Sequence, residues 1–168
     1  MGPTVAIWPT PQSPVPSPED LIRIANLLDP EAADANDFHV ASTIAIGGAV
    51  RADEPRPFGL ALGAVGSDDP DLARAAHLFG FTPTVAVHAL AYANQQVDHR
   101  VLGELELFLA RELRGLVDFG GSLGSLIPPQ GKLVAIPYAG SSGDEAFHIG
   151  DAAFLEWWLQ QPGFHMIK

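Results

Sequence analysis

Short apolar runs rich in β-branched and aromatic residues alternate along the chain with stretches whose apolar residues recur every three or four positions. The first pattern predicts strands, and the second predicts helices that bury one side. We expect strands over residues 4–8, 38–50, 58–65, 82–91, 116–119, 132–138 and 164–167. We expect helices over residues 18–28, 70–79, 98–114 and 152–161. Residues 51–57 are polar and contain proline, so they are predicted to link two strands.

The segment that begins at Ser67-Asp68-Asp69-Pro70 resembles the segment that begins at Gly150-Asp151. Each contains an acidic helix cap, a short apolar helix and a Gly-Phe step into a last extended piece. The element order is then β-α-β-β-α-β-α-β-β-α-β, as expected for two ferredoxin-like β-α-β-β-α-β units that share the strand near Val85. The predicted fold is α+β, a single domain 1–168 with similar halves of about 1–91 and 82–168, and with helices on one face of a mostly antiparallel sheet.

Composition narrows the function classes. The 168 residues carry 20 acidic and 9 basic side chains, a net charge of −11, and contain no cysteine. Thiol catalysis, cysteine-based zinc sites and disulfides are therefore excluded. The negative charge disfavours nucleic-acid binding and favours encounter with a basic protein. We find no secretory signal and no apolar run long enough to span a membrane, so a cytoplasmic protein is expected.

The six histidines show no HxH or HxxxH spacing, and there is no Gly-x-Ser-x-Gly elbow. We therefore predict no metal site, no cofactor and no catalytic residues. The pair Asp98-His99 is the most suggestive, because a carboxylate can orient an imidazole. The favoured interpretation is that Asp98 caps a helix and His99 is exposed.

Several segments resemble a bacterial family of unknown function. They are Gly2–Val5, Val97–Leu105, Gly115–Gly121 and Phe164–Lys168. The resemblance spans most of the chain and brings no established functional residues. Small acidic domains of this kind are similar in style to the immunity proteins of bacterial polymorphic toxin systems.

We therefore expect a non-enzymatic binding protein, most plausibly an immunity protein whose acidic face occludes a basic toxin. The expected partner contacts are Asp53 and Glu54 in the link between two strands, Asp144 and Glu145 in a Gly-rich turn, and Trp158 in the last helix.

Three alternatives stay open. A small-molecule sensor would place its ligand between the halves, near His88 and Asp118, with Asp98 and His99 as further pocket residues. A hydrolase would bring Asp98, His99 and Asp118 within hydrogen-bond reach of one another. A structural subunit would show a sizeable exposed apolar patch.

Overall fold

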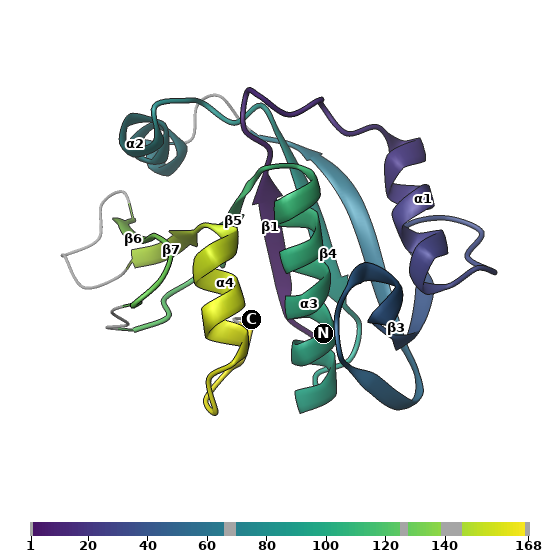
Figure 1. Cartoon of the computed structure of the whole chain (residues 1–168). Helices are drawn as coiled ribbons and strands as arrows, with labels where there is room; N and C mark the ends of the chain where they lie inside the picture. The colour runs from purple at the N-terminus through teal and green to yellow at the C-terminus, as the bar shows by residue number, and fades with distance from the viewer. Residues whose placement is uncertain (1, 66–69, 125–127, 139–145, 167–168) are drawn as a thin grey trace.

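A computed structural model describes residues 2–65, 70–124, 128–138 and 146–166 of the chain (Figure 1). The strands are β1 (Thr4–Trp8), β2 (Phe38–Ser42), β3 (Arg51–Ala64), β4 (Val85–Ala91), β5 (Leu116–Asp118), β6 (Leu133–Pro137) and β7 (Ala146–Gly150). The helices are α1 (Pro18–Leu28), α2 (Pro70–Phe79), α3 (Gln96–Glu112) and α4 (Ala152–Leu159), with a 3₁₀ turn, η1 (Ile44–Ile46), after β2.

The strands form one seven-stranded sheet in the order β2-β3-β4-β1-β5-β7-β6, and neighbouring strands are antiparallel. The first strand of the chain therefore lies at the centre. Ala6 of β1 is in register with His88 of β4 on one side and with Asp118 of β5 on the other. This row fixes the relative positions of two predicted site residues.

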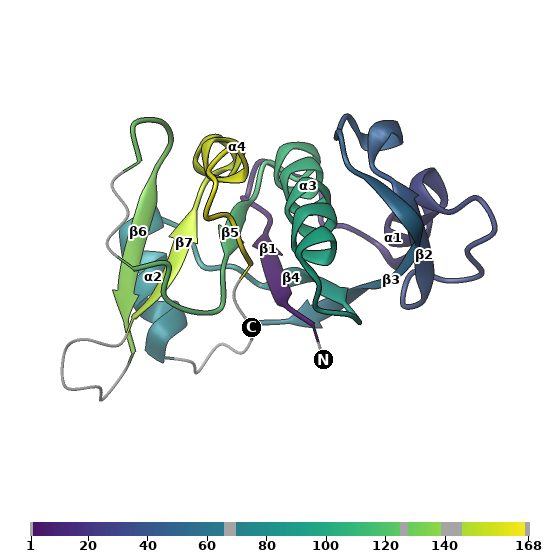
Figure 2. The same cartoon turned by 90° about the horizontal axis from the view of Figure 1, so that it is seen from below.

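Helices α1, α3 and α4 cover one face of the sheet, and α2 packs on the other (Figure 2). Alternate residues of β1 show the division. Val5 and Ile7 join the larger core beneath the three helices, whereas Ala6 and Trp8 join the smaller core with Ala75 of α2. The α+β class and the antiparallel sheet are confirmed, but the expectation that the helices share one face is wrong for α2.

The ferredoxin-like halves are not confirmed. A strand shared by both halves would have neighbours from each, but β4 pairs with β1 and β3, which both precede it in the chain. It is β1 that joins β4 to β5. The order of elements through β6 was predicted from the sequence. The order of the strands in the sheet depends on long-range pairing.

Residues 51–57 belong to β3 rather than to a link, and β2 ends at Ser42 rather than at Val50. The carbonyl of Pro57 accepts from the N–H of Tyr92, just after β4, so the backbone groups of Pro57 face away from β2. Pro55 lies where the β2–β3 register shifts between Val40 and Ser42. Proline is tolerated there because no ladder N–H is required of it.

The predicted closing strand is absent over residues 164–166. This segment instead packs on α3, where Phe164 contacts the Cα region of Gly103 and the N–H of Met166 donates to Nδ1 of His99. The seventh strand is β7, which the sequence analysis missed because its five residues sit between a Gly-rich stretch and a helix cap.

None of the helices in the described ranges has the length and apolar character needed to cross a membrane.

Candidate partner-binding surface

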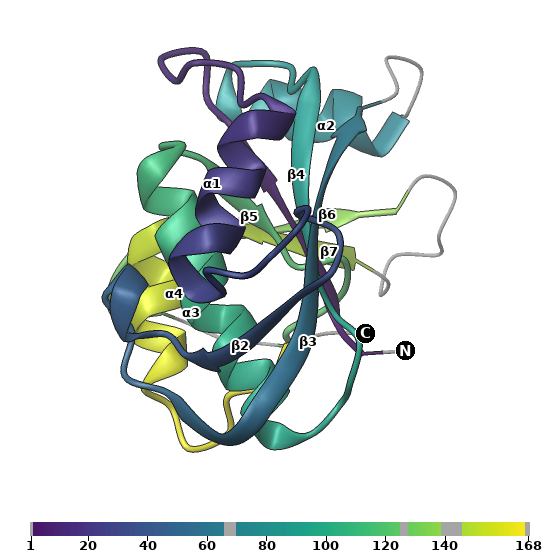
Figure 3. The same cartoon turned by 90° about the vertical axis from the view of Figure 1, so that its right-hand side faces the viewer.

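The segment after α1 meets the β2–β3 pair at the right of Figure 1, on the side that faces the viewer in Figure 3. Residues 29–37 join α1 to β2 and contain four carboxylates and no basic residue. The following six side chains are called the acidic end: Asp29, Glu31, Asp34, Asp37, Asp53 and Glu54. Asp29 is half-buried and the other five are exposed. Asp53 and Glu54 lie in a separate hollow together with Arg51 and Arg56.

Two of these carboxylates shape the backbone of the segment. Asp29 accepts hydrogen bonds from the N–H groups of Glu31 at 3.2 Å and His39 at 2.8 Å. Asp34 accepts from the N–H of Asn36 at 2.7 Å and that of Asp37 at 3.1 Å. Glu31 and Asp37 are exposed and have no ion-pair partner within the described chain, so their charges face solvent.

An open hollow of about 700 Å³ lies between this segment and the neighbouring strands. Asp29, Glu31 and Asp37 line it together with His39 of β2 and Pro55 of β3. Three carboxylates and one imidazole therefore line the same hollow.

A tyrosine fixes the segment to the sheet. The hydroxyl of Tyr92, just after β4, donates to the carbonyl of Asn36 at 2.6 Å. This hydrogen bond passes over Gly59 of β3. A Cβ added at Gly59 would lie 2.5 Å from the Asn36 oxygen and 2.6 Å from the Tyr92 oxygen. Only glycine leaves room for this bond.

We therefore expect Gly59→Ala to destabilise the protein by about 1–3 kcal/mol, because the bond to Asn36 must break or the strand must shift. Urea denaturation of the variant measures the loss. Tyr92→Phe is the matched control, since it removes the hydroxyl without the steric clash and should cost only about 1 kcal/mol. An alanine variant as stable as the wild type would contradict the close approach at Gly59.

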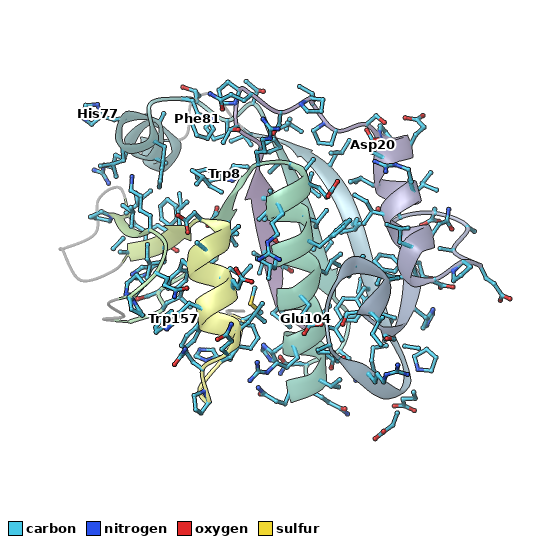
Figure 4. The ribbon with its side chains drawn as sticks, in the orientation of Figure 1. Trp8, Asp20, His77, Phe81, Glu104 and Trp157 are labelled. Atoms are coloured by element: carbon cyan, nitrogen blue, oxygen red, sulfur yellow. The ribbon has the colours of Figure 1, made fainter. Side chains whose placement is uncertain are left out.

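The predicted partner contacts have different positions. Asp53 and Glu54 are exposed on β3, and Glu54 pairs with Arg56 at 2.9 Å. Asp144 and Glu145 lie outside the described residues. Trp158 is only 7% exposed and packs against Phe164, so it is a core residue and not a surface anchor. Helical geometry turns its neighbour Trp157 outward, and Trp157 is half-buried on the outer side of α4 (Figure 4).

The alternative pocket residues separate into two groups on opposite faces. His88 and Asp118 flank Ala6 on the face that carries α2, about 10 Å apart by the spacing of two strands. Burial lowers the pKa of His88. Asp98 and His99 lie at the start of α3, on the other face. The three residues of the hydrolase hypothesis are therefore not brought together, and a ligand beside His88 and Asp118 remains a prediction.

Asp98 forms a buried ion pair. The Arg56 side chain donates from Nε to Oδ1 at 2.8 Å and from Nη2 to Oδ2 at 3.0 Å, and both side chains are buried. Oδ2 also accepts from the N–H of Gln95 at 2.6 Å, which completes a capping box at the start of α3. Burial acts to raise the pKa of Asp98, but the bonds from Arg56 and Gln95 outweigh it and hold that pKa below its ordinary value.

His99 is buried, contrary to the expectation that it would be exposed. Its Nδ1 accepts from the N–H of Met166 at 3.0 Å, so Nε2 carries the proton and donates to the Asn94 side-chain oxygen at 3.1 Å. The imidazole ties the C-terminal segment to α3, which is a structural role.

Two carboxylates of α3 were not identified from the sequence. Glu104 accepts from the hydroxyl of Thr43 and from the N–H groups of Ala49 at 3.0 Å and Val50 at 3.2 Å, so it holds the connection between β2 and β3 against α3 (Figure 4). Glu106 is fully buried, and neither of its oxygens has a hydrogen-bond partner in the described structure. The sequence did contain a signal for the burial of Glu106. Glu106 lies on the same side of the helix as Gly103 and Ala110, which are also buried.

No group of three histidine, aspartate or glutamate side chains among the described residues is arranged to hold a metal ion. The observed arrangement is that of an α+β protein with a seven-stranded antiparallel sheet. The chain belongs to the family of unknown function DUF6368, whose model matches residues 1–168. No curated protein and no solved structure matches the chain.

Proposed function

We propose that this protein is a non-enzymatic binding protein whose acidic end binds a basic partner protein. The observation that carries the proposal is the set of three carboxylates, Asp29, Glu31 and Asp37, that line the hollow beside residues 29–37, of which Glu31 and Asp37 are exposed. A field of one sign in a concave surface raises the rate of encounter with an oppositely charged protein and selects against acidic ones. The acidic end stands on a sheet and helices that hold it in place, which limits the entropy lost on binding.

The more specific form of the proposal is an immunity protein that neutralises a cognate bacterial toxin in the cytoplasm. An acidic surface placed over a basic active groove would exclude the toxin's substrate without any chemistry on the part of the inhibitor. The use of Asp98 and His99 in structural hydrogen bonds supports a binding role over a hydrolytic one.

The test is a pull-down with tagged protein from lysates of the native host and from co-expression of neighbouring genes, eluted with a salt gradient. Wild type should retain a basic protein that is released as salt rises, because salt screens interactions between exposed charges. The triple variant Glu31→Gln/Asp37→Asn/Asp53→Asn should bind the same protein about tenfold more weakly, since each exposed charge contributes up to about 1 kcal/mol.

Glu112→Gln is the control, because Glu112 is exposed on α3, outside the acidic end. It should leave retention within about twofold of wild type. Partner retention that changes neither with salt concentration nor in the triple variant would contradict the proposal.

A further inference from the structure

Within the described residues, no strand pairs with the outer edge of the C-terminal half of β3. The N–H of Val65 donates to the carbonyl of Thr84, and the N–H of Tyr92 donates to the carbonyl of Pro57. In an antiparallel pair, residues that exchange hydrogen bonds alternate with residues that do not. The odd-numbered residues of β3 therefore point their backbone groups toward β4 in this half, and the even-numbered residues point theirs the other way.

On that outer edge, the described chain supplies one backbone bond beyond the end of β2. The N–H of Leu60 donates to the carbonyl of Ala35 at 2.6 Å. The N–H and carbonyl groups of Leu62 and Ala64 have no backbone partner on this side within the described residues. Such a row of free groups is a template for an added strand.

An apolar pocket of about 320 Å³ opens beside this edge. Leu21 and Ile22 of α1 line it on one side, Ala35 at one end, and Leu60 and Leu62 of β3 on the other side. Figures 1 and 3 show α1 running alongside β3 here. A side chain that leaves an added strand on the face shared with Leu62 would enter this pocket, because paired residues point to the same face.

Asp34 is the one charged side chain among the described residues that line the pocket. Arg23, next to the lining residue Ile22, is paired with Asp20 at 3.3 Å. Glu19 is exposed in the first turn of α1, next to Pro18, which also lines the pocket. An occupant with basic residues on either side of an apolar one would complement this arrangement.

We infer that the edge of β3 at Leu62–Ala64 is a docking site for an extended segment of the basic partner, added as an antiparallel strand with an apolar side chain in the α1–β3 pocket and Lys or Arg two residues away on either side. Backbone bonds to Leu62 and Ala64 supply affinity, and the pocket with its acidic flanks supplies selectivity. The inference rests on the proposed function and names the form in which the partner is recognised.

The probe is a capped heptapeptide, Thr-Lys-Thr-Leu-Thr-Lys-Thr, added to ¹⁵N-labelled protein and followed by NMR. Its central Leu and both Lys residues lie on one face of a strand. Amide shifts should change at Ala35, at residues 60–64 and at Leu21 and Ile22, and the amides of Leu62 and Ala64 should become protected from exchange. Shifts confined to residues 29–31 and 53–54 would overturn the inference.

The backbone bonds are tested from both sides. Ala64→Pro removes the outward N–H and should weaken binding about tenfold, whereas Ala64→Ser retains it and should stay within about twofold of wild type. N-methylation of the Leu in the peptide removes the opposing donor without altering the protein. It should weaken binding by a similar factor. Equal binding of the N-methylated and unmodified peptides would overturn the inference, even where Ala64→Pro fails to fold.

Other occupants give different results. Shifts at residues 60–64 that grow with protein concentration and without peptide would show that a second copy of the chain occupies the edge, and would overturn the inference. A peptide with Ser in place of Leu that binds equally well would show attraction by charge alone, with the same consequence.

The inference and the proposed function can fail separately. Loss of the basic partner in the triple variant, together with full retention in Ala64→Pro, would overturn the strand-docking inference and support the proposed function. Partner retention that none of these variants alters would count against both.

Discussion

Replacement of Asp98 by alanine is expected to destabilise the protein by about 3–5 kcal/mol, the cost of leaving a buried charge without its partner. Arg56 is 8% exposed and makes two bonds to the Asp98 carboxylate. The variant leaves this guanidinium with only Glu54, which is largely exposed. It also removes the carboxylate that accepts from Gln95 at the start of α3. Urea denaturation monitored by circular dichroism measures the loss.

The double variant Arg56→Met/Asp98→Ala provides the control. It removes the guanidinium charge that Asp98→Ala leaves buried without its partner, so it should be more stable than Asp98→Ala by about 1–3 kcal/mol. A double variant that is no more stable than the single one would show that the ion pair is not the source of the effect.

The Asp98 effect should also depend on pH. Because its folded pKa is below the ordinary value, the carboxylate contributes stability above the unfolded pKa of about 3.9, and this contribution is lost as pH falls through the folded pKa. The stability difference between wild type and Asp98→Asn should therefore narrow in acid. A difference that stays constant from neutral pH to acid would contradict the assignment.

Replacement of Glu106 by leucine is expected to stabilise the protein by about 1–3 kcal/mol at neutral pH. Burial raises the pKa of Glu106 well above its ordinary value, and the negative charge of Asp118 adds to this. Both carboxyl oxygens are buried without a hydrogen-bond partner in the described structure. An apolar side chain removes the cost of desolvating them.

The pH dependence has the opposite sign to that of Asp98. The unfolded chain ionises Glu106 above about pH 4.3, so wild-type stability falls as pH rises from there toward the folded pKa. Glutamine cannot ionise. The stability of Glu106→Gln relative to wild type should therefore increase between pH 4 and neutral pH. Glu112→Gln on the exposed side of the same helix should show no such trend. A stability difference between Glu106→Gln and wild type that is the same at every pH would contradict the raised pKa.

The starts of α1 and α4 could be predicted because their signals are local, whereas α3 begins at Gln96, two residues before the predicted start, with Gln95 as its N-cap. Ser17 caps α1 through a bond from the N–H of Asp20, and Asp151 caps α4 through a bond from the N–H of Phe154. The extent of β3 could not be predicted, because Pro57 is acceptable only in a register that turns its backbone groups toward β4, and Pro55 only where the β2–β3 register shifts. That register is set by pairing with residues far along the chain.

The candidate surface was only partly readable. Glu31, Asp34 and Asp37 form a run without bases, and this local signal was available in the sequence. The position of Asp53 and Glu54 depends on the register shift between β2 and β3. The burial of Trp158 and of Glu106 depends on how the C-terminal segment and α4 pack on α3, which the helical pattern alone does not decide.

The most direct test of the central claim is hydrogen–deuterium exchange of the protein alone and bound to its captured basic partner. The account predicts that protection on binding is concentrated in residues 29–37 and 51–56, which carry the acidic end, and extends to residues 60–64 where the partner adds a strand. Protection confined to β6, β7 and α2, with unchanged exchange over the acidic end, would contradict it.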